Sequence, residues 1–508
     1  MSVAPTSAIQ PARVAHRGLI TIAVMLATVM QTLDTTIANV ALPYMQGSMA
    51  ATQDQISWVL TSYIVAAAIC TPLNGFLVNR FGRKRVFFWE VFGFTCVSVL
   101  CGVAQSLPEI VTFRILQGIF GAGLVPLSQA VQLDVYEPKE RGQAMAIWGI
   151  GVMVGPILGP TLGGYLTEFY NWRWVFFINL PVGILALVGI WLFVPETKPN
   201  KTIRFDGLGF GLLAIAIGAL QMFLDRGESK DWFTSTEIII EGICAILFIY
   251  LFIVHMFTHK TPFIHPAMFK DRNFCIGLLL IFILGVMLLS TVALLSPFLE
   301  NLLGYPVLAT GFAMAPRGLG TMLSMSLVGH LMRRFDLRTL LVVGLLMMVE
   351  SLWEMSLFDL NITFIDLFRT GFIQGFGMGF VFVPLSTMTF MTLDQKYRNE
   401  GTAMYSLLRN IGSSIGISIV VTLLSQNTQV FHSILAENTN GFNAVWLHQL
   451  PTLWDLKSAS GLALLNKTIT QQASLIAYLR DFRLMMFITL LALPLIFLLR
   501  KRTPAITH

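Results

Sequence analysis

The sequence predicts an all-α polytopic membrane protein with about 14 transmembrane helices, arranged as two six-helix bundles with an inserted two-helix hairpin. Three observations lead to this fold class. The 508-residue chain is 55% hydrophobic and only 12% charged. Its apolar runs reach roughly 20 residues, the length at which a helix spans a bilayer. Motifs from the first half of the chain recur in the second half.

Apolar runs separated by short polar segments mark the predicted spans. We place them at residues 18–40, 56–78, 86–105, 109–132, 143–166, 174–194, 207–224, 236–257, 275–298, 309–331, 339–358, 365–391, 403–425 and 482–500. At about 1.5 Å per residue, each covers a hydrocarbon core of roughly 30 Å. Polar tails remain at 1–17 and 501–508, and a long polar loop remains at 426–481. A loop of that length is usually functional or disordered, and docking of a partner protein is one interpretation of it.

The distribution of Lys and Arg predicts the orientation of the spans. With both termini in the cytoplasm, the inner segments carry 22 of these residues and the outer segments carry seven. This asymmetry follows the positive-inside rule and predicts two cytoplasmic termini and a periplasmic loop at 426–481. It also accounts for the net charge of +6 without a nucleic-acid partner, because basic loops lie beside anionic lipid.

An internal repeat predicts two halves of similar structure. The sequence RILQGIFGAGLVPLS at 114–128 has a counterpart in QGFGMGFVFVPLS at 374–386, and RGQAM at 141–145 is matched by EGTAM at 400–404, with offsets close to 258 residues. Parallel repeats of this kind are typical of transporters that bind substrate between their two halves. We therefore predict one six-helix bundle at 18–194, a hairpin at 195–260 and a second bundle at 261–500.

The first span contains one carboxylate, Asp34, and no cation. An ionisable group inside a membrane costs about 2.5–3.5 kcal/mol or more, so it indicates function. Asp34 lies roughly 13 Å and Arg114 roughly 9 Å below the outer ends of their spans, counted from Pro43 and Pro108. We expect Arg114 to hold Asp34 ionised, so that separating the two lets the carboxylate take a proton. The alternative is that Arg114 reaches outward to the interface or to span-end carbonyls.

Other polar side chains inside the spans are candidates for a buried network or for the substrate cavity. The cavity candidates are Gln31, Thr35, Asn39, Gln117, Arg317, Gln374 and Arg409, and Arg369 is a further arginine within an apolar run. Glu350 and Glu354 lie four residues apart on one helix face and form a second acidic candidate for proton or cation binding. The structural interpretation, which we favour, places Glu354 near the outer interface and Glu350 against a neighbouring helix.

The fifth span carries glycines four residues apart together with two prolines. The motif consists of Gly151, Gly155, Pro156, Gly159, Pro160 and Gly163. Such a stripe lets a neighbouring helix approach backbone to backbone, and the prolines remove helix hydrogen bonds and permit a kink.

The loop between the second and third spans has the sequence GFLVNRFGRKR at 75–85. Its candidate gate residues are Gly75, Asn79, Arg80, Gly82, Arg83 and Lys84. The alternative is an ordinary basic loop that only fixes topology.

Together these motifs resemble the major facilitator superfamily, in its fourteen-span drug:proton antiporter group. The first-helix signature, the cytoplasmic loop, the fourth-helix motif and the fifth-helix antiporter motif match at residues 33–43, 75–84, 114–123 and 151–164. Two further segments typical of the fourteen-span group are NWRWVFFINLPVG at 171–183 and RNIGSSIG at 409–416.

A narrower resemblance is to the EmrB-type inner-membrane subunits of tripartite multidrug pumps. It depends on LDRG and DWF near residues 224–233, on FKDRNF at 269–274 and on TQQAS at 470–474 within the long outer loop. The resemblance covers nearly the whole chain.

This resemblance implies export of hydrophobic or amphipathic drugs across the bacterial inner membrane, driven by inward proton flow. The drug would pass to an EmrA-like periplasmic adaptor and an outer-membrane channel. Asp34 would carry the proton, and Arg114 would tune how readily Asp34 takes up and releases it. Arg80, Arg83 and Lys84 would belong to a cytoplasmic gate. The family loop usually has Asp where this chain has Asn79, which puts a strong electrostatic gate at that loop in doubt.

Three alternative functions can be weighed against this one, by features that the sequence lacks or by experiment. The same fold could export a lipid, siderophore or metabolite. A membrane-embedded enzyme would need a nucleophile–His–acid set, a phosphate-binding loop or a metal-ligand run, and we find none in the sequence. A sensor or scaffold would not depend on Asp34. We expect no cofactor and no metal site, since His255, His259 and His265 lack Cys or carboxylate ligands at ligand spacing.

Overall fold

The structure is a computed structural model that describes residues 16–500 apart from 138–139, 198, 201, 203 and 439–457. Its helices are α1 (Arg17–Ser48), α2 (Gln53–Cys70), α3 (Leu73–Phe81), α4 (Arg83–Val103), α5 (Leu107–Gly121), α6 (Leu124–Val135), α7 (Arg141–Phe169), α8 (Trp174–Phe177), α9 (Asn179–Phe193), α10 (Gly207–Arg226), α11 (Thr236–Thr258), α12 (Arg272–Pro297), α13 (Val307–Leu331), α14 (Leu337–Met355), α15 (Phe364–Met391), α16 (Arg398–Asn438) and α18 (Ala459–Leu498). Only short 3-10 and π turns add to them, and the described residues contain no strand. The all-helical prediction is therefore confirmed.

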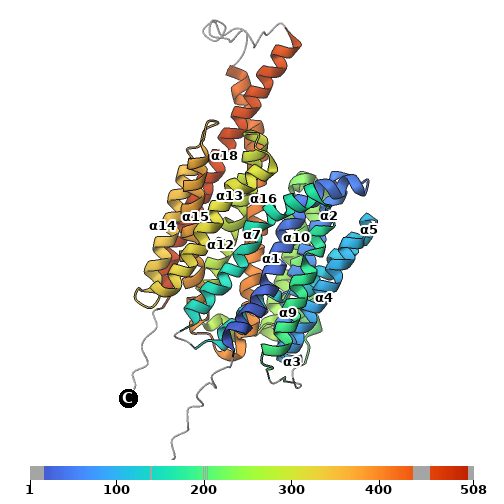
Figure 1. The fold of residues 1–508 in the computed structure, drawn as a ribbon, viewed down its shortest axis with the longest axis vertical. Helices are drawn as coiled ribbons and strands as arrows, with labels where there is room; N and C mark the ends of the chain where they lie inside the picture. The colour runs from blue at the N-terminus through green and yellow to red at the C-terminus, as the bar shows by residue number, and fades with distance from the viewer. Residues whose placement is uncertain are drawn as a thin grey trace, which may run out of the picture.

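The two halves of the chain pack their helices in the same pattern. In the first half α1 packs on α7, α2 on α5 and α4 on α9, and in the second half α12 packs on α16, α13 on α15 and α14 on α18. Figure 1 shows α12 to α15 and α18 on one side of the molecule and α1, α2, α4, α5 and α9 on the other. The sequence repeat is thus a repeat of helix packing.

The helices α10 and α11 form the inserted hairpin. They pack on each other, and α10 contacts both α2 of the first half and α16 of the second half. Gln221 of α10 donates from Nε2 to the Ser414 hydroxyl of α16 at 2.8 Å, and Thr61 of α2 donates to the Asp225 carboxylate of α10. The hairpin therefore lies along the seam between the halves.

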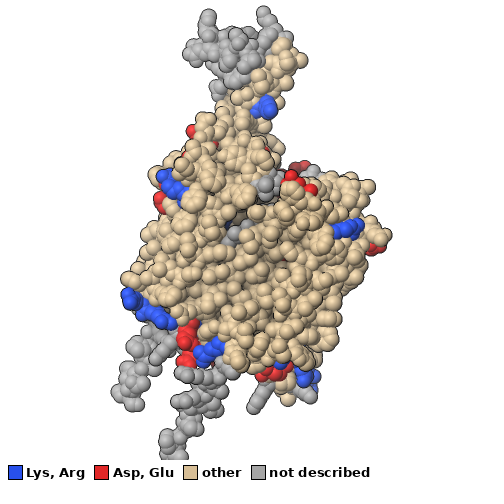
Figure 2. Space-filling model, viewed as in Figure 1, with Lys and Arg blue, Asp and Glu red and all other residues tan. Residues whose placement is uncertain are grey.

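Eleven described helical segments are long and apolar enough to cross a membrane, and the bent pair α2–α3 would make twelve. The helices α13 and α14 are not among them, although both pack against α15 within the bundle. The count of fourteen spans therefore stays a prediction. Figure 2 shows charged side chains near the two ends of the visible face and a broad uncharged band between them, as a protein embedded in a bilayer requires.

Two predicted spans are broken by proline. The second span bends by 53° between α2 and α3, where Pro72 lacks the N–H that would continue the helix. The fourth span is interrupted between α5 and α6 at Ala122 and Gly123, four residues and three residues before Pro126. The two breaks lie together, because the Thr71 hydroxyl is 3.4 Å from the Ala122 carbonyl oxygen.

We call the side of the bundle on which α1, α4 and α7 begin the basic side, and the other the opposite side. Arg17 at the start of α1 pairs with Glu140 beside the start of α7 at 2.8 Å. Arg500, the last described residue, lies beside the start of α12, where its N–H donates to Asn273 at 2.7 Å. Figure 1 places the basic side at the bottom.

The helices α16 and α18 extend beyond the other helices on the opposite side (Figure 1). They continue into the predicted 426–481 loop from both ends, and residues 439–457 of that loop lie outside the described residues. Phe431, Leu465 and Ile469 are buried, and His432 lies 2.9 Å from the Asn466 amide oxygen. The sequence places these flanks in a loop because they are too polar for a span, and it predicts a helical stretch at 466–479 within that loop, which α18 contains.

Candidate functional site

Asp34 lies inside the first bundle, with its side chain fully buried. Its Oδ2 pairs with Nη1 of Arg114 at 2.6 Å, and its Oδ1 accepts hydrogen bonds from the side-chain amides of Gln117 at 2.9 Å and Asn179 at 3.0 Å. Arg114 is also fully buried. The carboxylate is therefore held by one cation and two neutral donors from α5 and α9.

A second set of contacts fixes the partners of Asp34. Arg114 donates from Nε to the Val59 carbonyl at 3.0 Å, and its guanidinium lies 4.2 Å from the centre of the Tyr63 ring. Asn179 also donates to the Ser98 hydroxyl at 2.9 Å. Arg114 Nη2 has no hydrogen-bond partner among the described residues. The guanidinium is thus positioned by α2, and one of its donor groups remains available for rearrangement.

The glycine stripe of α7 lies directly against the helix that carries Asp34. A Cβ atom at Gly155 would collide with the backbone of Thr32, and one at Gly159 would collide with the side chain of Thr36. The Thr36 hydroxyl donates to the Gly155 carbonyl at 2.9 Å. The other motif residues continue the contact, with Gly151 against Met25 and Gly163 against Ile37 and Val40, while Pro156 and Pro160 lie within α7.

Replacing Gly155 by alanine is expected to weaken this contact. The added methyl group meets backbone, which cannot move aside, and overpacking of this kind costs about 1–3 kcal/mol. Gly164→Ala is the matched control, because no atom lies within 4 Å of its Cβ position. Thermal unfolding of the purified protein in detergent should show a lower midpoint for Gly155→Ala only. Equal midpoints for the two variants would contradict the close α1–α7 contact.

The three remaining α1 candidates form a row four residues apart. Gln31 is half-buried and donates to the Tyr63 hydroxyl at 3.3 Å, so it joins the surroundings of Arg114. Thr35 is half-buried and bonds to its own helix at the Thr32 carbonyl, and Asn39 is exposed. Of the cavity candidates, Gln117 instead belongs to the Asp34 network.

The second bundle holds the other cavity candidates. Arg317 of α13 is buried and donates from Nη2 to the Leu288 carbonyl at 3.1 Å, and its backbone packs against Gly375 of α15. Gln374 is fully buried, and neither atom of its amide has a partner among the described residues. Arg409 is buried, with its backbone against Gly285 of α12. The structure gives Arg317 and Arg409 no ion pair within the described residues.

Charged residues join the two bundles at the basic side. Asp134 of α6 accepts from Arg83 of α4 at 2.7 Å and from Arg398 of α16 at 2.7 Å. Arg83 also donates to the Asn399 amide oxygen at 2.7 Å. Asp134 therefore lies between a cation of each bundle, and the role of the 75–85 loop as a gate stays a prediction.

Asn79 and Gly75 complete the contact between the bundles. Asn79 accepts from the Asn399 amide at 3.0 Å and lies 3.4 Å from Glu400 Oε1. Gly75 packs against Glu400, where a Cβ would lie 2.9 Å from its Cγ. The acidic group beside Asn79 is thus Glu400 of the second bundle.

Gly82 and Lys84 lie away from this contact. Gly82 has a φ of 93°, a left-handed conformation that favours glycine, and packs against Glu196. The Lys84 N–H donates to Glu196 at 3.1 Å, and its ammonium group lies 5.6 Å from the Trp191 ring centre. Arg80 lies at the end of α3 and is also engaged in an interaction. Gly82 and Lys84 therefore brace the end of α9 rather than the second bundle.

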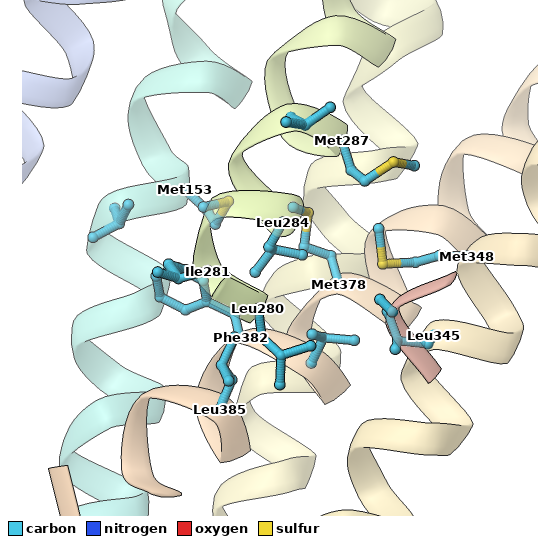
Figure 3. Close-up of a cluster of buried hydrophobic side chains, with 14 of the residues drawn as sticks. Met153, Leu280, Ile281, Leu284, Met287, Leu345, Met348, Met378, Phe382 and Leu385 are labelled. Atoms are coloured by element: carbon cyan, nitrogen blue, oxygen red, sulfur yellow. The ribbon is translucent and has the colours of Figure 1, made fainter. Parts of the chain in front are cut away.

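An apolar layer lies next to the charged contact. The Trp148 ring of α7 stacks on Phe382 of α15 at 5.7 Å, and Gly149 packs against Met325 of α13. Figure 3 shows Met153 beside Ile281, Leu284 and Phe382, so α7 meets the second bundle through buried side chains. Together, the charged and apolar contacts close the basic side between the two bundles.

The second acidic candidate does not form a buried site. Glu354 pairs with Arg369 at 3.0 Å, and Arg369 is 58% exposed. Glu350 is exposed on α14, so the interpretation that it faces a neighbouring helix is wrong. Arg369 is likewise not part of a buried network. An exposed residue near a helix end can reach the interface, which the apolar sequence around it could not reveal.

Sequence reasoning missed several contact residues. Asn179 stood inside a recognised motif but had no assigned role, and Arg398 counted only as a topology charge. Asp134 and Arg398 are 264 residues apart, so no local signal joins them. The repeat in the sequence was the one clue, since it places α6 and the start of α16 at the same side of the bundle.

A carboxylate also lies beside the histidines at the basic end of the hairpin. The ligand atoms of Asp206, His255 and His259 lie within 4.8 Å of one another. Burial acts to raise the pKa of Asp206, but hydrogen bonds from the Gly209 N–H, His255 and the Phe263 N–H together lower it. Because Asp206 caps α10 and binds the loop after α11, we interpret this cluster as an anchor of the hairpin.

Comparison with known proteins identifies the family. Residues 24–417 match the family model described as Major Facilitator Superfamily. The chain belongs to the major facilitator superfamily. It is 37% identical to the multidrug export protein EmrB of Escherichia coli (strain K12), over 85% of each chain, and 35% identical to the fatty acid resistance protein FarB of Neisseria gonorrhoeae, over 92% of each chain. These relatives also show the narrower EmrB-type family.

A solved structure shows that this major facilitator protein shares the fold of its superfamily. The human organic anion transporter MFSD10 aligns with a TM-score of 0.59 at 16% identity, covering 94% of this chain and 100% of that one. Family and fold together make this EmrB-type protein a multi-pass membrane transporter and not an enzyme.

Proposed function

We propose that this EmrB-type protein is a proton-coupled antiporter that exports hydrophobic or amphipathic compounds across the bacterial inner membrane. The observation that carries the proposal is the buried ion pair between Asp34 and Arg114, at 2.6 Å. A fully buried carboxylate inside a membrane bundle is costly, so it is retained where it binds a proton or an ion. The proton gradient would supply the energy, and no cofactor would be needed.

The contacts of Asp34 suggest how a proton could be taken up and released. In this structure Arg114 and two amides satisfy the carboxylate. If a change in helix position separates Arg114 from Asp34, the carboxylate loses its counter-charge and protonation becomes favourable. Return of Arg114 expels the proton. Arg114 can move with α5, whose helix is interrupted at Gly123.

The glycine stripe offers a route from this site to the conformational change. Gly155 and Gly159 set α7 directly on α1 beside Asp34, and the Trp148 end of α7 meets the second bundle. A shift of α1 against α7 would therefore be passed to the contact that closes the basic side. Two packed arrangements of such an interface are the usual basis for alternating access.

The basic side is the proposed cytoplasmic side, because the positive-inside rule places Lys and Arg there. The described ends of the chain, at His16 and Arg500, both lie on it, so both termini would be cytoplasmic. The extended helices α16 and α18 then project into the periplasm. Their length beyond the bundle supports docking of an EmrA-like adaptor that leads to an outer-membrane channel.

The names of the relatives suggest two classes of cargo. The relatives are named for multidrug export and for fatty acid resistance, at 37% and 35% identity. The FarB name favours a lipid-like cargo as a second candidate, and a siderophore or metabolite is a further alternative. Gln31, Thr35 and Asn39 would contact the cargo from α1.

The test is transport by purified protein in liposomes with an imposed pH gradient. A panel would contain apolar cationic dyes, uncharged apolar drugs, a long-chain fatty acid and a siderophore, with protein-free liposomes correcting for passive permeation. We expect apolar drugs to dissipate the gradient, as read by an internal pH-sensitive dye. If no apolar drug does so and the fatty acid does, the cargo is lipid-like. If no compound does so, proton-coupled export is wrong.

A further inference from the structure

A second buried carboxylate, Glu90, lies in the first bundle apart from the Asp34 network. It is on α4, and only 7% of it is exposed. Counted along their helices, Glu90 lies seven residues from Arg83 and Asp34 lies 17 residues from Arg17. At about 1.5 Å per residue these positions are roughly 10 Å and 26 Å from the basic ends of their helices. Glu90 is thus between Asp34 and the basic side in depth.

Glu90 lies where two helices are broken. With its amide oriented to satisfy both ends, Asn74 of α3 donates to Glu90 Oε1 and accepts from the Gly123 N–H at 3.1 Å. A Cβ at Gly123 would collide with both carboxyl oxygens. The carboxyl group therefore fills the space left by the missing side chain at the α5–α6 interruption, beside the α2–α3 bend.

The surroundings of Glu90 provide no counter-charge. Its Oε2 has no hydrogen-bond partner among the described residues. The helices packed on α4 carry these charged residues: Arg80 on α3, Glu109 and Arg114 on α5, and Asp134 on α6. Asp34 engages Arg114, and Asp134 pairs with Arg83 and Arg398. The Gln105 N–H donates to Glu109, on the opposite side. Arg80 is itself engaged in an interaction.

Burial without a cation favours the neutral carboxylic acid over the carboxylate. Glu90 therefore contrasts with Asp34, which lies in the same bundle and has Arg114 beside it. Different environments of this kind allow two acidic groups of one protein to take different roles in proton transfer.

Tyr63 connects the surroundings of the two carboxyl groups. Its ring lies under the Arg114 guanidinium at 4.2 Å, and its hydroxyl is 3.0 Å from a Cβ built at Gly121. Glu90 packs on Gly123, which follows Gly121 by two residues in the sequence. A displacement of the α5–α6 interruption would therefore act on Arg114 and on Glu90 together.

We propose that Glu90 is a second proton-binding group of the transport cycle, which holds a proton in this closed state and releases it toward the basic side. The proposal builds on the proposed function, proton-coupled export. Release breaks the O–H bond of the carboxylic acid and passes the proton to water, leaving a carboxylate. The Asn74 amide, which the Gly123 N–H holds in place through the Asn74 amide oxygen, is the donor available to that carboxylate.

The experiment separates net proton-driven transport from exchange. Wild type and Glu90→Gln are reconstituted, and uphill export under a pH gradient is compared with exchange of labelled for unlabelled drug at equal pH. Glutamine is isosteric and neutral but cannot release a proton. We expect uphill export to fall by roughly 100-fold, the usual contribution of a positioned proton-transfer group, while exchange is unchanged. Glu350→Gln, which alters an exposed carboxylate, should change neither.

Infrared spectroscopy of the substrate-free protein gives a readout that a packing role would not move. Wild type should show the carbonyl band of a protonated carboxylic acid that is absent in Glu90→Gln and shifted in Glu90→Asp, which keeps a carboxyl group if glutamine impairs folding. An unshifted band in Glu90→Asp, or wild-type uphill export by Glu90→Gln, would overturn the proposal. If wild type itself shows no proton-driven export, the proposed function fails instead.

Discussion

Asp34→Asn is expected to abolish proton-driven export, by about 100-fold or more, because asparagine cannot bind and release a proton. The neutral amide still fits between Gln117 and Asn179, so the local packing is retained. Uphill transport in liposomes and substrate-induced proton release in detergent both measure the effect. An unaltered proton-release signal in the variant would rule out Asp34 as the proton site.

The substitution has a second consequence, which a paired variant can separate. Asp34→Asn leaves Arg114 buried without its counter-charge, and breaking a buried ion pair in this way costs about 3–5 kcal/mol. Adding Arg114→Gln removes the uncompensated charge and should recover thermal stability but not transport. Glu350→Gln is the matched acid-to-amide control, and a loss of transport in that variant would revive the second acidic candidate.

Asp134→Asn is expected to open the basic side. It removes the carboxylate that bridges Arg83 and Arg398 and leaves two cations facing each other between the bundles. Arg83 and Arg398 are buried and Asp134 is half-buried, and we expect a shift of about 1–3 kcal/mol, or 5–150-fold, toward the state that is open on this side.

A single cysteine can report this opening. Met325→Cys in a background without Cys70, Cys96, Cys101, Cys244 and Cys275 places a thiol in the apolar layer, where Met325 is now fully buried against Gly149. Asp134→Asn should speed its labelling by a membrane-impermeant reagent added on the basic side. Asp394→Asn removes an exposed ion pair with Lys396 and is the control. Equal labelling rates in the two variants would show that Asp134 does not hold this side closed.

The fold could be predicted from sequence because a membrane helix can be recognised from the residues of the helix alone. An apolar run long enough to span the bilayer must satisfy its own backbone hydrogen bonds, so length and composition decide the element. The repeat near 258 residues then implied two bundles, and the paired packing of α1 with α7 and α12 with α16 follows it. The breaks at Pro72 and before Pro126 were less visible, because proline is tolerated in membrane helices and its presence does not say whether the helix continues.

The candidate site was only partly predictable. Equal depth in the membrane placed Arg114 near Asp34 before any contact was known. Depth alone does not tell which way a side chain faces around its helix. Asn179 and Tyr63 therefore had no assigned role, and Glu350 was expected to face a neighbouring helix although it is exposed. The sequence predicts no role for Glu90, because one carboxylate near the end of an apolar run resembles an ordinary interfacial residue.

Hydropathy, basic loops and an internal repeat can be identified along the chain, so they are enough to establish a helical membrane protein of two repeated halves. Which charges meet depends on the tertiary packing. Asp134 and Arg398 bridge the bundles across 264 residues, and Glu90 meets Gly123 because two helix breaks coincide. Such contacts depend on how helices rotate and pack against one another, and buried charges are sensitive to displacements that leave the hydropathy pattern unchanged.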